Sequence, residues 1–227
     1  MGEQKPLKQR AILVGAGEGA VAVQRLAPGQ SGDVLICADG GRRKLEALGL
    51  KPDWYVGDND SGGCPDGLPS VLLPPEKDVS DMEMAVDKAL ELGCREIILT
   101  GCSGGRLDHL LANLGLLERI EAAKAQGMLL DGENEVRLLR PGHYRILNQP
   151  PAHYLGLIAL DETVEGLTLK GVKYPLERFT LHRGNTRTVS NEILPGEAAE
   201  LSFQRGSLYV IRSGFCDTQP ADRRLKV

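Results

Sequence analysis

The stretch Val34–Ser61, VLICADGGRRKLEALGLKPDWYVGDNDS, contains two short apolar segments separated by a helical pattern. Val34–Ala38 has the continuous apolar character of a buried parallel strand. Helix-forming residues follow over Arg42–Leu48, and Gly49 is placed as a C-cap. A second strand is expected over Asp53–Gly57. The order strand, helix, strand predicts an α/β domain with a parallel sheet.

Acidic residues follow both of these predicted strands. Asp39 comes directly after the first strand, and Asp58 and Asp60 come after the second. Ligands of open α/β sheets bind outside the carboxyl ends of the strands, so these side chains should lie at one edge. Neighbouring carboxylates repel one another unless a cation joins them. Mg²⁺ suits the position, because it binds one or two carboxylates together with substrate phosphates.

The length and charge of the chain limit its function. Its 227 residues are enough for one large domain or two of ordinary size. The formal net charge of −4 argues against a nucleic-acid partner bound by phosphate neutralisation. A polyphosphate ligand would therefore need local positive charge from Mg²⁺, helix N-termini and a few Lys or Arg side chains.

Cysteine usage and hydropathy predict the compartment. The five cysteines lack any Cys-x-x-Cys spacing, which favours free thiols in a reducing environment over a zinc site. The N-terminal sequence MGEQKPLKQR lacks the apolar core of a signal peptide, and no run of about 18 apolar residues occurs. We expect a cytoplasmic protein that has no membrane partner.

A glycine-rich turn follows an expected first strand at Ala11–Val14. The residues of 15–20, GAGEGA, formally satisfy the dinucleotide fingerprint. Asp39 lies where the ribose-binding acid of such a fold would be, but it opens a Gly-Gly turn with two more acids behind it. A tight strand-to-helix turn is therefore the favoured interpretation, and a nicotinamide-dependent dehydrogenase is the weaker alternative.

The segment 77–83, KDVSDME, precedes another expected helix. Ser80 and Glu83 have the spacing of a capping box, and acids in a first turn oppose the helix dipole favourably. Capping does not account for Lys77 and Asp78 just before it. Lys77 is a candidate phosphate contact, and Asp78 or Asp81 is a candidate metal ligand.

A second glycine-rich turn lies between the strand expected at Ile97–Thr100 and a helical pattern from Leu110 to about Gln126. Backbone N–H groups of Gly104 and Gly105 could cradle a phosphate at the helix N-terminus. Arg106 could add a bidentate contact to phosphate oxygens. Asp108 and His109 follow, and from spacing alone each could be either functional or structural.

Beyond Pro141 the helical period disappears and short alternating segments take over. They are expected as strands over His153–Leu160, Thr163–Leu169, Arg178–Leu181, Arg187–Leu194, Ala198–Gln204 and Ser207–Arg212. This pattern predicts an antiparallel sandwich or barrel and a domain boundary near Pro141. Within it, 184–192 concentrates small hydrogen-bonding side chains, which could also be a polar turn.

Five motifs in order resemble the thiamine pyrophosphokinase family. They are ADGG (38–41), PDWYVGDNDS (52–61), KDVSD (77–81), GGRLDH (104–109) with Asn113 behind it, and VSNE (189–192). The family usually has Phe where this chain has Asn59 and Thr where it has Ser80. Both departures are peripheral to the acids, and Ser80 keeps a hydroxyl cap.

The resemblance implies two domains and a reaction. Residues 1–141 would form a Rossmann-like α/β domain that binds nucleotide and Mg²⁺, and 142–227 an antiparallel β-sandwich that binds thiamine. The implied reaction transfers pyrophosphate from ATP to the hydroxyl of thiamine and leaves AMP. The resemblance also implies a homodimer with its active sites in clefts between subunits.

Motif position assigns roles to individual residues. The implied catalytic residues are Asp39, Asp58, Asp60 and Asp81, of which the last three would bind Mg²⁺. The implied ATP-binding residues are Lys77, Asp78, Ser80, Gly104, Gly105, Arg106, Asp108 and His109. The implied thiamine-binding residues are Gly40, Gly41, Ser190 and Asn191.

The sequence leaves open which alcohol accepts the pyrophosphate and whether the protein is catalytically active. The nucleotide motifs do not select the alcohol, so a pyrophosphokinase acting on a hydroxymethylpterin is an alternative. A catalytically silent nucleotide or thiamine sensor is another, although clustered acids without a metal would be destabilising. Asp39 or Asp81 could be the base, and Tyr174 and Phe179 are candidate ring partners for thiamine.

Overall fold

The computed structural model describes residues 10–17, 23, 26, 28, 33–58, 67–72, 78–148 and 154–214. The chain divides into two compact units, Met1–Gly132 and Glu133–Val227. The division falls before the strand β7 (Asn134–Leu139), which belongs to the second unit because it pairs along its whole length with β13 (Leu208–Ser213). The expected boundary at Pro141 therefore lies inside the second unit.

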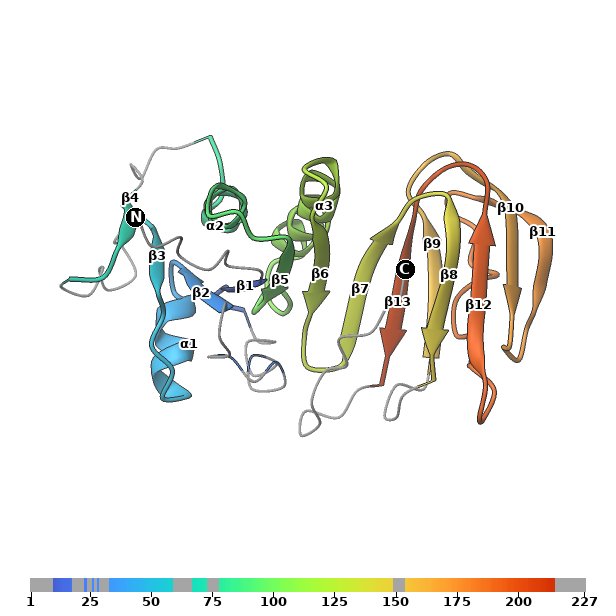
Figure 1. Ribbon diagram of the computed structural model, residues 1–227, viewed down its shortest axis with the longest axis horizontal. Helices are drawn as coiled ribbons and strands as arrows, with labels where there is room; N and C mark the ends of the chain where they lie inside the picture. The colour runs from blue at the N-terminus through green and yellow to red at the C-terminus, as the bar shows by residue number, and fades with distance from the viewer. Residues whose placement is uncertain are drawn as a thin grey trace, which may run out of the picture. The chain divides into compact units, whose positions relative to one another are not determined.

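The first unit is an α/β arrangement with a parallel sheet (Figure 1). Its elements are β1 (Arg10–Val14), β2 (Asp33–Ala38), α1 (Gly41–Ala47), β3 (Trp54–Gly57), β4 (Ser70–Leu72), α2 (Asp81–Glu91), β5 (Glu96–Thr100), α3 (Leu107–Ala122) and β6 (Gln126–Leu130). The strand order is β4-β3-β2-β1-β5-β6. All pairings within this set are parallel, so the carboxyl ends of the strands share one edge.

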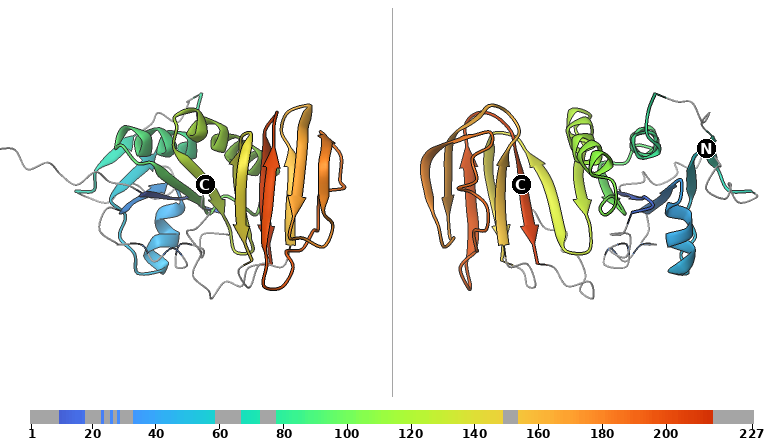
Figure 2. Two further views of the ribbon diagram at one scale, coloured as in Figure 1. Left: turned by 45° about the vertical axis from the view of Figure 1, so that its right-hand side comes forward. Right: turned by 180° about the vertical axis from the view of Figure 1, so that it is seen from behind.

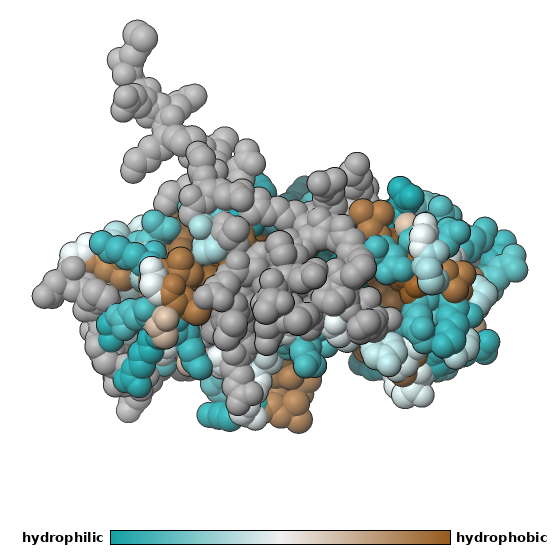
Figure 3. Space-filling model, turned by 90° about the horizontal axis from the view of Figure 1, so that it is seen from below, coloured by the Kyte–Doolittle hydropathy of each residue, from teal (hydrophilic) through white to brown (hydrophobic). Residues whose placement is uncertain are grey.

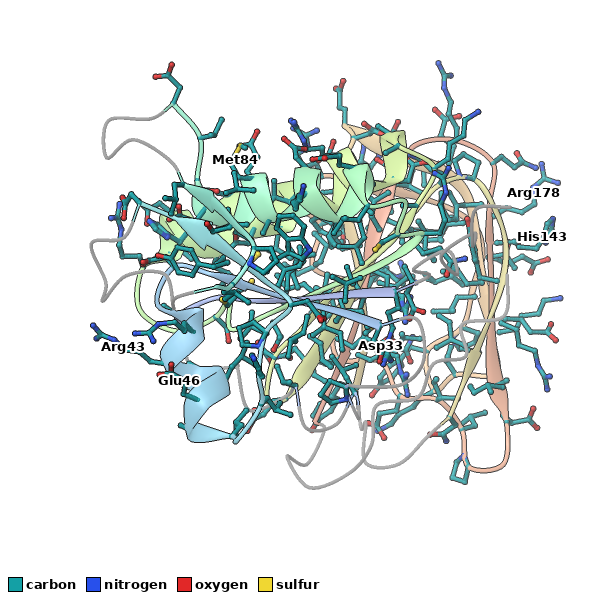
Figure 4. All side chains as sticks on the ribbon, turned by 60° about the vertical axis from the view of Figure 1, so that its left-hand side comes forward. Asp33, Arg43, Glu46, Met84, His143 and Arg178 are labelled. Atoms are coloured by element: carbon teal, nitrogen blue, oxygen red, sulfur yellow. The ribbon has the colours of Figure 1, made fainter. Side chains whose placement is uncertain are left out.

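Helices cover both faces of this sheet. Figure 4 shows the labelled side chains of Arg43 and Glu46 on α1 and that of Met84 on α2 at opposite faces. As a result β1 is buried at every position, and β2 and β5 are buried at all but their first. This explains why these segments are continuously apolar in the sequence.

Two expected boundaries in this unit shift. The helix expected from Leu110 to about Gln126 runs instead over Leu107–Ala122, since the polar first turn at 107–109 is already helical. The helix expected over Arg42–Leu48 is observed one residue earlier, as α1 over Gly41–Ala47.

In the second unit, the described residues form strands joined by turns and loops, without a helix (Figures 1 and 2). Besides β7 and β13 they are β8 (Gly142–Leu147), β9 (Tyr154–Ala159), β10 (Thr163–Lys170), β11 (Leu176–His182) and β12 (Ala198–Phe203). One antiparallel set has the order β7-β13-β9, and a separate antiparallel sheet has the order β11-β10-β12-β8.

A single hydrophobic cluster joins the two strand sets of the second unit. It includes Leu157 of β9 and Val210 of β13 from one set, and Leu167 of β10 and Leu201 of β12 from the other. On the face drawn in Figure 3, the coloured surface of this unit is mainly hydrophilic. Alternation along each strand therefore separates the buried from the solvent-facing side chains.

One strand prediction in this unit is wrong and one strand was missed. Arg187–Leu194 forms turns with isolated bridges at Asn191 and Ile193, because Ser190 has a φ of +57° and interrupts extended backbone. β8 was not expected, yet it pairs with β12 along its full length. In the described part of the chain, no helix has the length and apolar character needed to span a membrane.

Candidate nucleotide and metal site

A cavity of about 430 Å³ lies at the carboxyl edge of the parallel sheet. Its lining comes from the loops after β1, β2 and β5 and from the first turns of α2 and α3. Several segments predicted to bind a nucleotide therefore meet in one place, and two helix N-termini are directed toward it. Such N-termini favour anions because their first N–H groups have no partner within the helix.

The loops after β1 and β5 touch each other at the floor of this cavity. The N–H of Gly15 donates to the Thr100 carbonyl, and that of Gly17 donates to the Gly101 carbonyl, each at 2.8 Å. A Cβ on Gly15 would stand 2.6 Å from the Gly101 oxygen. The first two glycines of the fingerprint are thus required by contact between loops. The helix expected after them lies outside the described residues.

Two of the four predicted catalytic carboxylates line this cavity. Asp39 follows β2 in a left-handed conformation (φ +44°), its N–H donates to the Val56 carbonyl at 2.8 Å, and it lines the cavity. Asp81, the first residue of α2, lines it too. Asp58 follows β3 but is not part of the lining, and Asp60 lies outside the described residues. Within the described ranges, no three His, Cys, Asp or Glu side chains form a metal-binding group.

The start of α2 has the expected cap. The Ser80 hydroxyl accepts a hydrogen bond from the N–H of Glu83 at 3.1 Å, and Ser80 also lines the cavity. Asp78 is exposed and outside the lining, and Lys77 lies outside the described residues. Ser80 therefore has a clear structural role in addition to its predicted contact with nucleotide.

The turn between β5 and α3 contains the two glycines that were predicted to cradle a phosphate. Gly104 and Gly105 have φ values of +79° and +73°, which favour glycine, and both line the cavity. Arg106 is the N-cap residue of α3 but its side chain makes no capping bond. The Arg106 side chain thus leaves the first N–H groups of α3 uncapped at the edge of the cavity, apart from that of His109, which donates to the Asp108 carboxylate.

Arg106 is held by Asp108. Its Nε and Nη2 donate to the two carboxylate oxygens at 3.1 and 2.5 Å, and the N–H of His109 donates to Asp108 at 2.9 Å. The hydrogen bonds from Arg106 lower the pKa of Asp108 to about 2, and the same pair raises the pKa of Arg106. Arg106 and His109 line the cavity. Asp108 does not line it, and its two hydrogen bonds hold the guanidinium of Arg106.

The predicted thiamine residues of the first unit have a structural explanation. Gly41 begins α1 and is buried, and a Cβ on it would overlap the carbonyl group of Val14 in β1. A Cβ on Gly40 would stand 3.0 Å from that of Ala16. Neither glycine lines the cavity: Gly41 allows α1 to pack closely against β1, and Gly40 lies close to the loop that follows β1.

The predicted thiamine residues of the second unit differ from each other. Asn191 is 4% exposed, and its side chain accepts from the N–H groups of Tyr174 and Glu192 and donates to the Tyr174 carbonyl. Ser190 is exposed. Asn191 therefore uses most of its hydrogen-bonding capacity to connect two segments of its own unit.

Two candidate ring partners also lie in the second unit. Tyr174 is 57% exposed, and the Nζ of Lys173 lies 5.6 Å from its ring centroid. The guanidinium carbon of Arg187 lies 5.1 Å from the centroid of Phe179. Both rings thus already have a cation nearby.

Sequence reasoning gave no role to two buried residues of the cavity, Cys102 and Asn113. Burial, followed by the charge of Asp131, raises the pKa of the Cys102 thiol to about 12. Cys102 is therefore an unreactive lining residue. The sequence marks Asn113 only by its place behind the GGRLDH motif; a further signal is that the residues that continue its face of α3, Leu116, Leu117 and Ile120, are apolar.

Two family models match this chain. Residues 29–129 match "Thiamin pyrophosphokinase, catalytic domain", and residues 143–208 match "Thiamin pyrophosphokinase, vitamin B1 binding domain". The first matched range includes the described lining residues from Ala38 to Asn113. The second covers β9 to β12 of the antiparallel unit.

Individual relatives agree with these models. A thiamine pyrophosphokinase of Bacillus subtilis (strain 168) is 36% identical over 138 residues, which are 61% of this chain and 64% of that protein, just under two thirds of its length. A solved thiamine pyrophosphokinase structure from Bacillus subtilis is 30% identical with a TM-score of 0.82, covering 91% of this chain and 99% of that one. The corresponding structure from Geobacillus thermodenitrificans is 31% identical with a TM-score of 0.78, covering 96% and 100%. Because both family models match in order and the solved relatives are matched over nearly their full length, the chain belongs to the thiamine pyrophosphokinase family.

Proposed function

We propose that this protein is a thiamine diphosphokinase, which transfers the pyrophosphoryl group of Mg-ATP to the hydroxyl of thiamine and releases AMP. The observation that carries the proposal is one cavity lined by two carboxylates, a glycine turn and an arginine. These are Asp39, Asp81, Gly104-Gly105 and Arg106. Family membership supports the same reaction.

The phosphates would bind at the α3 end of the cavity. The N–H groups after the Gly104-Gly105 turn and the guanidinium of Arg106 supply hydrogen bonds to phosphate oxygens there. Asp108 keeps the guanidinium oriented, and His109 lies on the same wall. Ser80 would contact the nucleotide from α2, and the roles of Lys77 and Asp78 stay predictions.

The carboxylates suit Mg²⁺. Asp39 and Asp81 both line the cavity and offer hard oxygen donors, and one or two carboxylates are the usual protein share of a magnesium-phosphate site. Asp58 and Asp60 are proposed as further ligands from their place in the same family motif. When bound, Mg²⁺ would neutralise charge on the β- and γ-phosphate oxygens.

The chemical step needs a positioned alcohol and a proton acceptor. The thiamine hydroxyl would attack the β-phosphorus opposite the departing AMP oxygen, so that one P–O bond forms as another breaks. Asp39 or Asp81 would accept the hydroxyl proton, since both carboxylates face the cavity.

The acceptor side is proposed from the family. The second unit would be a β-sandwich that binds thiamine with Ser190 and Asn191, while Gly40 and Gly41 of the Rossmann-like first unit would support the same substrate through the packing of α1. We further propose a homodimer and a cytoplasmic location, which suits five cysteines without a Cys-x-x-Cys pair.

The test is AMP release from ATP and Mg²⁺ with thiamine, with a hydroxymethylpterin, and with neither acceptor. Thiamine-dependent AMP together with an equal amount of thiamine diphosphate is the expected result. AMP formed with the pterin alone would keep the nucleotide chemistry and refute the acceptor. Tight binding of ATP or thiamine without AMP would replace the proposal with the sensor alternative.

A further inference from the structure

The buried face of α3 ends in an amide. Its buried residues are Asn113, Leu116, Leu117 and Ile120, so one stripe continues from the core to the cavity. Asn113 is only 9% exposed and is the one polar member of that stripe. It therefore occupies a position where core packing would favour an apolar side chain.

The Asn113 amide makes no hydrogen bond to any residue that the structure describes. Its nitrogen and oxygen are not among the fully enclosed side-chain atoms that lack a partner in the described residues, so the amide is open toward the cavity. A polar group placed there is satisfied by water or by a bound ligand. Asn is also a weaker helix former than Leu or Ala. Since Asn113 lines the cavity, the missing partner would enter from there.

The chemistry of an amide narrows the partner. Asn113 lies seven residues after Arg106, which is about 10 Å along α3 and nearly the same helix face. It is therefore well removed from the turn that would hold the phosphates. An amide offers both a donor and an acceptor, whereas phosphate oxygens only accept. A nucleobase edge presents both, and Asn is well suited to adenine.

We propose that Asn113 recognises the base of the nucleotide. Its carbonyl accepts from the exocyclic amino group of adenine, and its N–H donates to the adjacent ring nitrogen. Asn113 is thus a specificity-determining residue. This inference rests on the proposed function, because it takes the cavity to be the nucleotide site.

The first test is Asn113→Leu, which keeps the approximate size and removes the amide. Without nucleotide, the variant should unfold at the same or a higher temperature than the wild type, since no hydrogen bond within the described protein is lost and Leu is the better helix former. Its affinity for Mg-ATP should fall about tenfold, the worth of one or two lost hydrogen bonds. Displacement of trinitrophenyl-ATP measures the affinity, and Glu118→Gln on the exposed face of α3 is the control that should change neither quantity.

The second test is Asn113→Asp, which leaves only acceptors. A carboxylate keeps the bond from the adenine amino group, loses the donor to the ring nitrogen, and matches the two neighbouring N–H donors of guanine. The ratio of kcat/KM for ATP to that for GTP should therefore fall by about tenfold or more. AMP and GMP release under thiamine saturation gives both values.

The outcomes separate this inference from the proposed function. Unchanged ATP affinity in Asn113→Leu, or an unchanged ATP-to-GTP ratio in Asn113→Asp, would overturn base recognition while wild-type turnover stood. A lower unfolding temperature in Asn113→Leu would also overturn it, because the amide would then serve the fold. A wild-type protein that binds ATP but makes no thiamine diphosphate would refute the proposed function, and the binding comparison would still decide the role of Asn113.

Discussion

The guanidinium of Arg106 and the carboxylate of Asp108 form a two-point pair, with donor–acceptor distances of 3.1 and 2.5 Å. The pair lies at the start of α3, where Arg106 lines the cavity and Asp108 does not. Both side chains are largely exposed, so the pair contributes little to stability. Its effect is to fix the plane of the guanidinium before a phosphate arrives.

Removing the arginine should weaken ATP use. Arg106→Ala is expected to raise the KM for ATP about tenfold or more, because a charge-assisted contact to phosphate is lost. Arg119→Ala is a matched control, since Arg119, farther along α3, makes a comparable two-point pair with Asp87 of α2. Steady-state kinetics with varied ATP measure the effect, and an equal rise in the control would remove the specific role of Arg106.

The pair also predicts a pH profile. The lowered pKa of Asp108, about 2, means that its interaction with Arg106 is fully present above its ordinary pKa and is lost only as pH falls through the lowered value. Asp108 should therefore stay ionised between about pH 5 and 9. The pH profiles of kcat/KM for ATP should have the same shape in wild type and Asp108→Asn, with lower kcat/KM values in the variant at every pH. An acid limb near pH 5 that the variant lacked would contradict this assignment.

Two neighbouring residues at the start of α2 should separate stability from activity. Ser80→Ala removes the cap to Glu83 and should lower the free energy of unfolding by about 1 kcal/mol. Asp81→Asn keeps the size of the side chain and its place in the first turn of α2, and it should abolish most turnover. Denaturant unfolding and AMP release across a Mg²⁺ titration measure the two effects. Near-normal turnover of Asp81→Asn at saturating Mg²⁺ would exclude the carboxylate from the metal site.

Two glycines in helices should respond oppositely to alanine. Gly41→Ala places a methyl group on the carbonyl of Val14 and should destabilise the protein by about 2 kcal/mol or more. Gly115→Ala, in α3, meets no atom within 4 Å and should stabilise it by roughly 0.5–1 kcal/mol. Urea denaturation gives both values. Equal tolerance at the two positions would mean that α1 can move away from β1.

The two predicted thiamine residues of the second unit should also behave differently. Asn191→Ala breaks three hydrogen bonds to Tyr174 and Glu192 and should lower the free energy of unfolding by about 2 kcal/mol. Ser190→Ala should leave stability within about 0.5 kcal/mol, since the side chain is exposed, and should raise the KM for thiamine. An unchanged thiamine KM in Ser190→Ala would refute its predicted substrate contact.

Local signals were enough to predict many of the elements. The apolar runs of β1, β2 and β5 identify buried parallel strands because no face of them meets water. The start of α2 follows from Ser80 and Glu83, since a cap acts across only three residues. The glycines at 104 and 105 likewise predict a turn with positive φ, because glycine adopts such angles without strain, and both have them in the structure.

Failures arose where distant contacts override a local pattern. Residues 187–194 alternate like a strand, but the bonds of Asn191 to Leu155 and Tyr174 fold them into turns. β8 was missed because its pairing partner, β12, begins about fifty residues later, with Leu147 opposite Ala198. Such pairings depend on where the chain returns in space, which spacing along the sequence does not encode.

By itself, the sequence determined the α/β class of the first unit, the antiparallel character of the second, and the residue types of the cavity that we propose as the nucleotide site. Each of these depends on the period of hydrophobicity or on residues adjacent in the chain. Only the tertiary structure decided that Asp39 and Asp81 share one cavity while Gly41 packs against Val14. It also decided that the buried amide of Asn113 meets the cavity and not the core, because burial and hydrogen bonding depend on the packing of segments far apart in sequence.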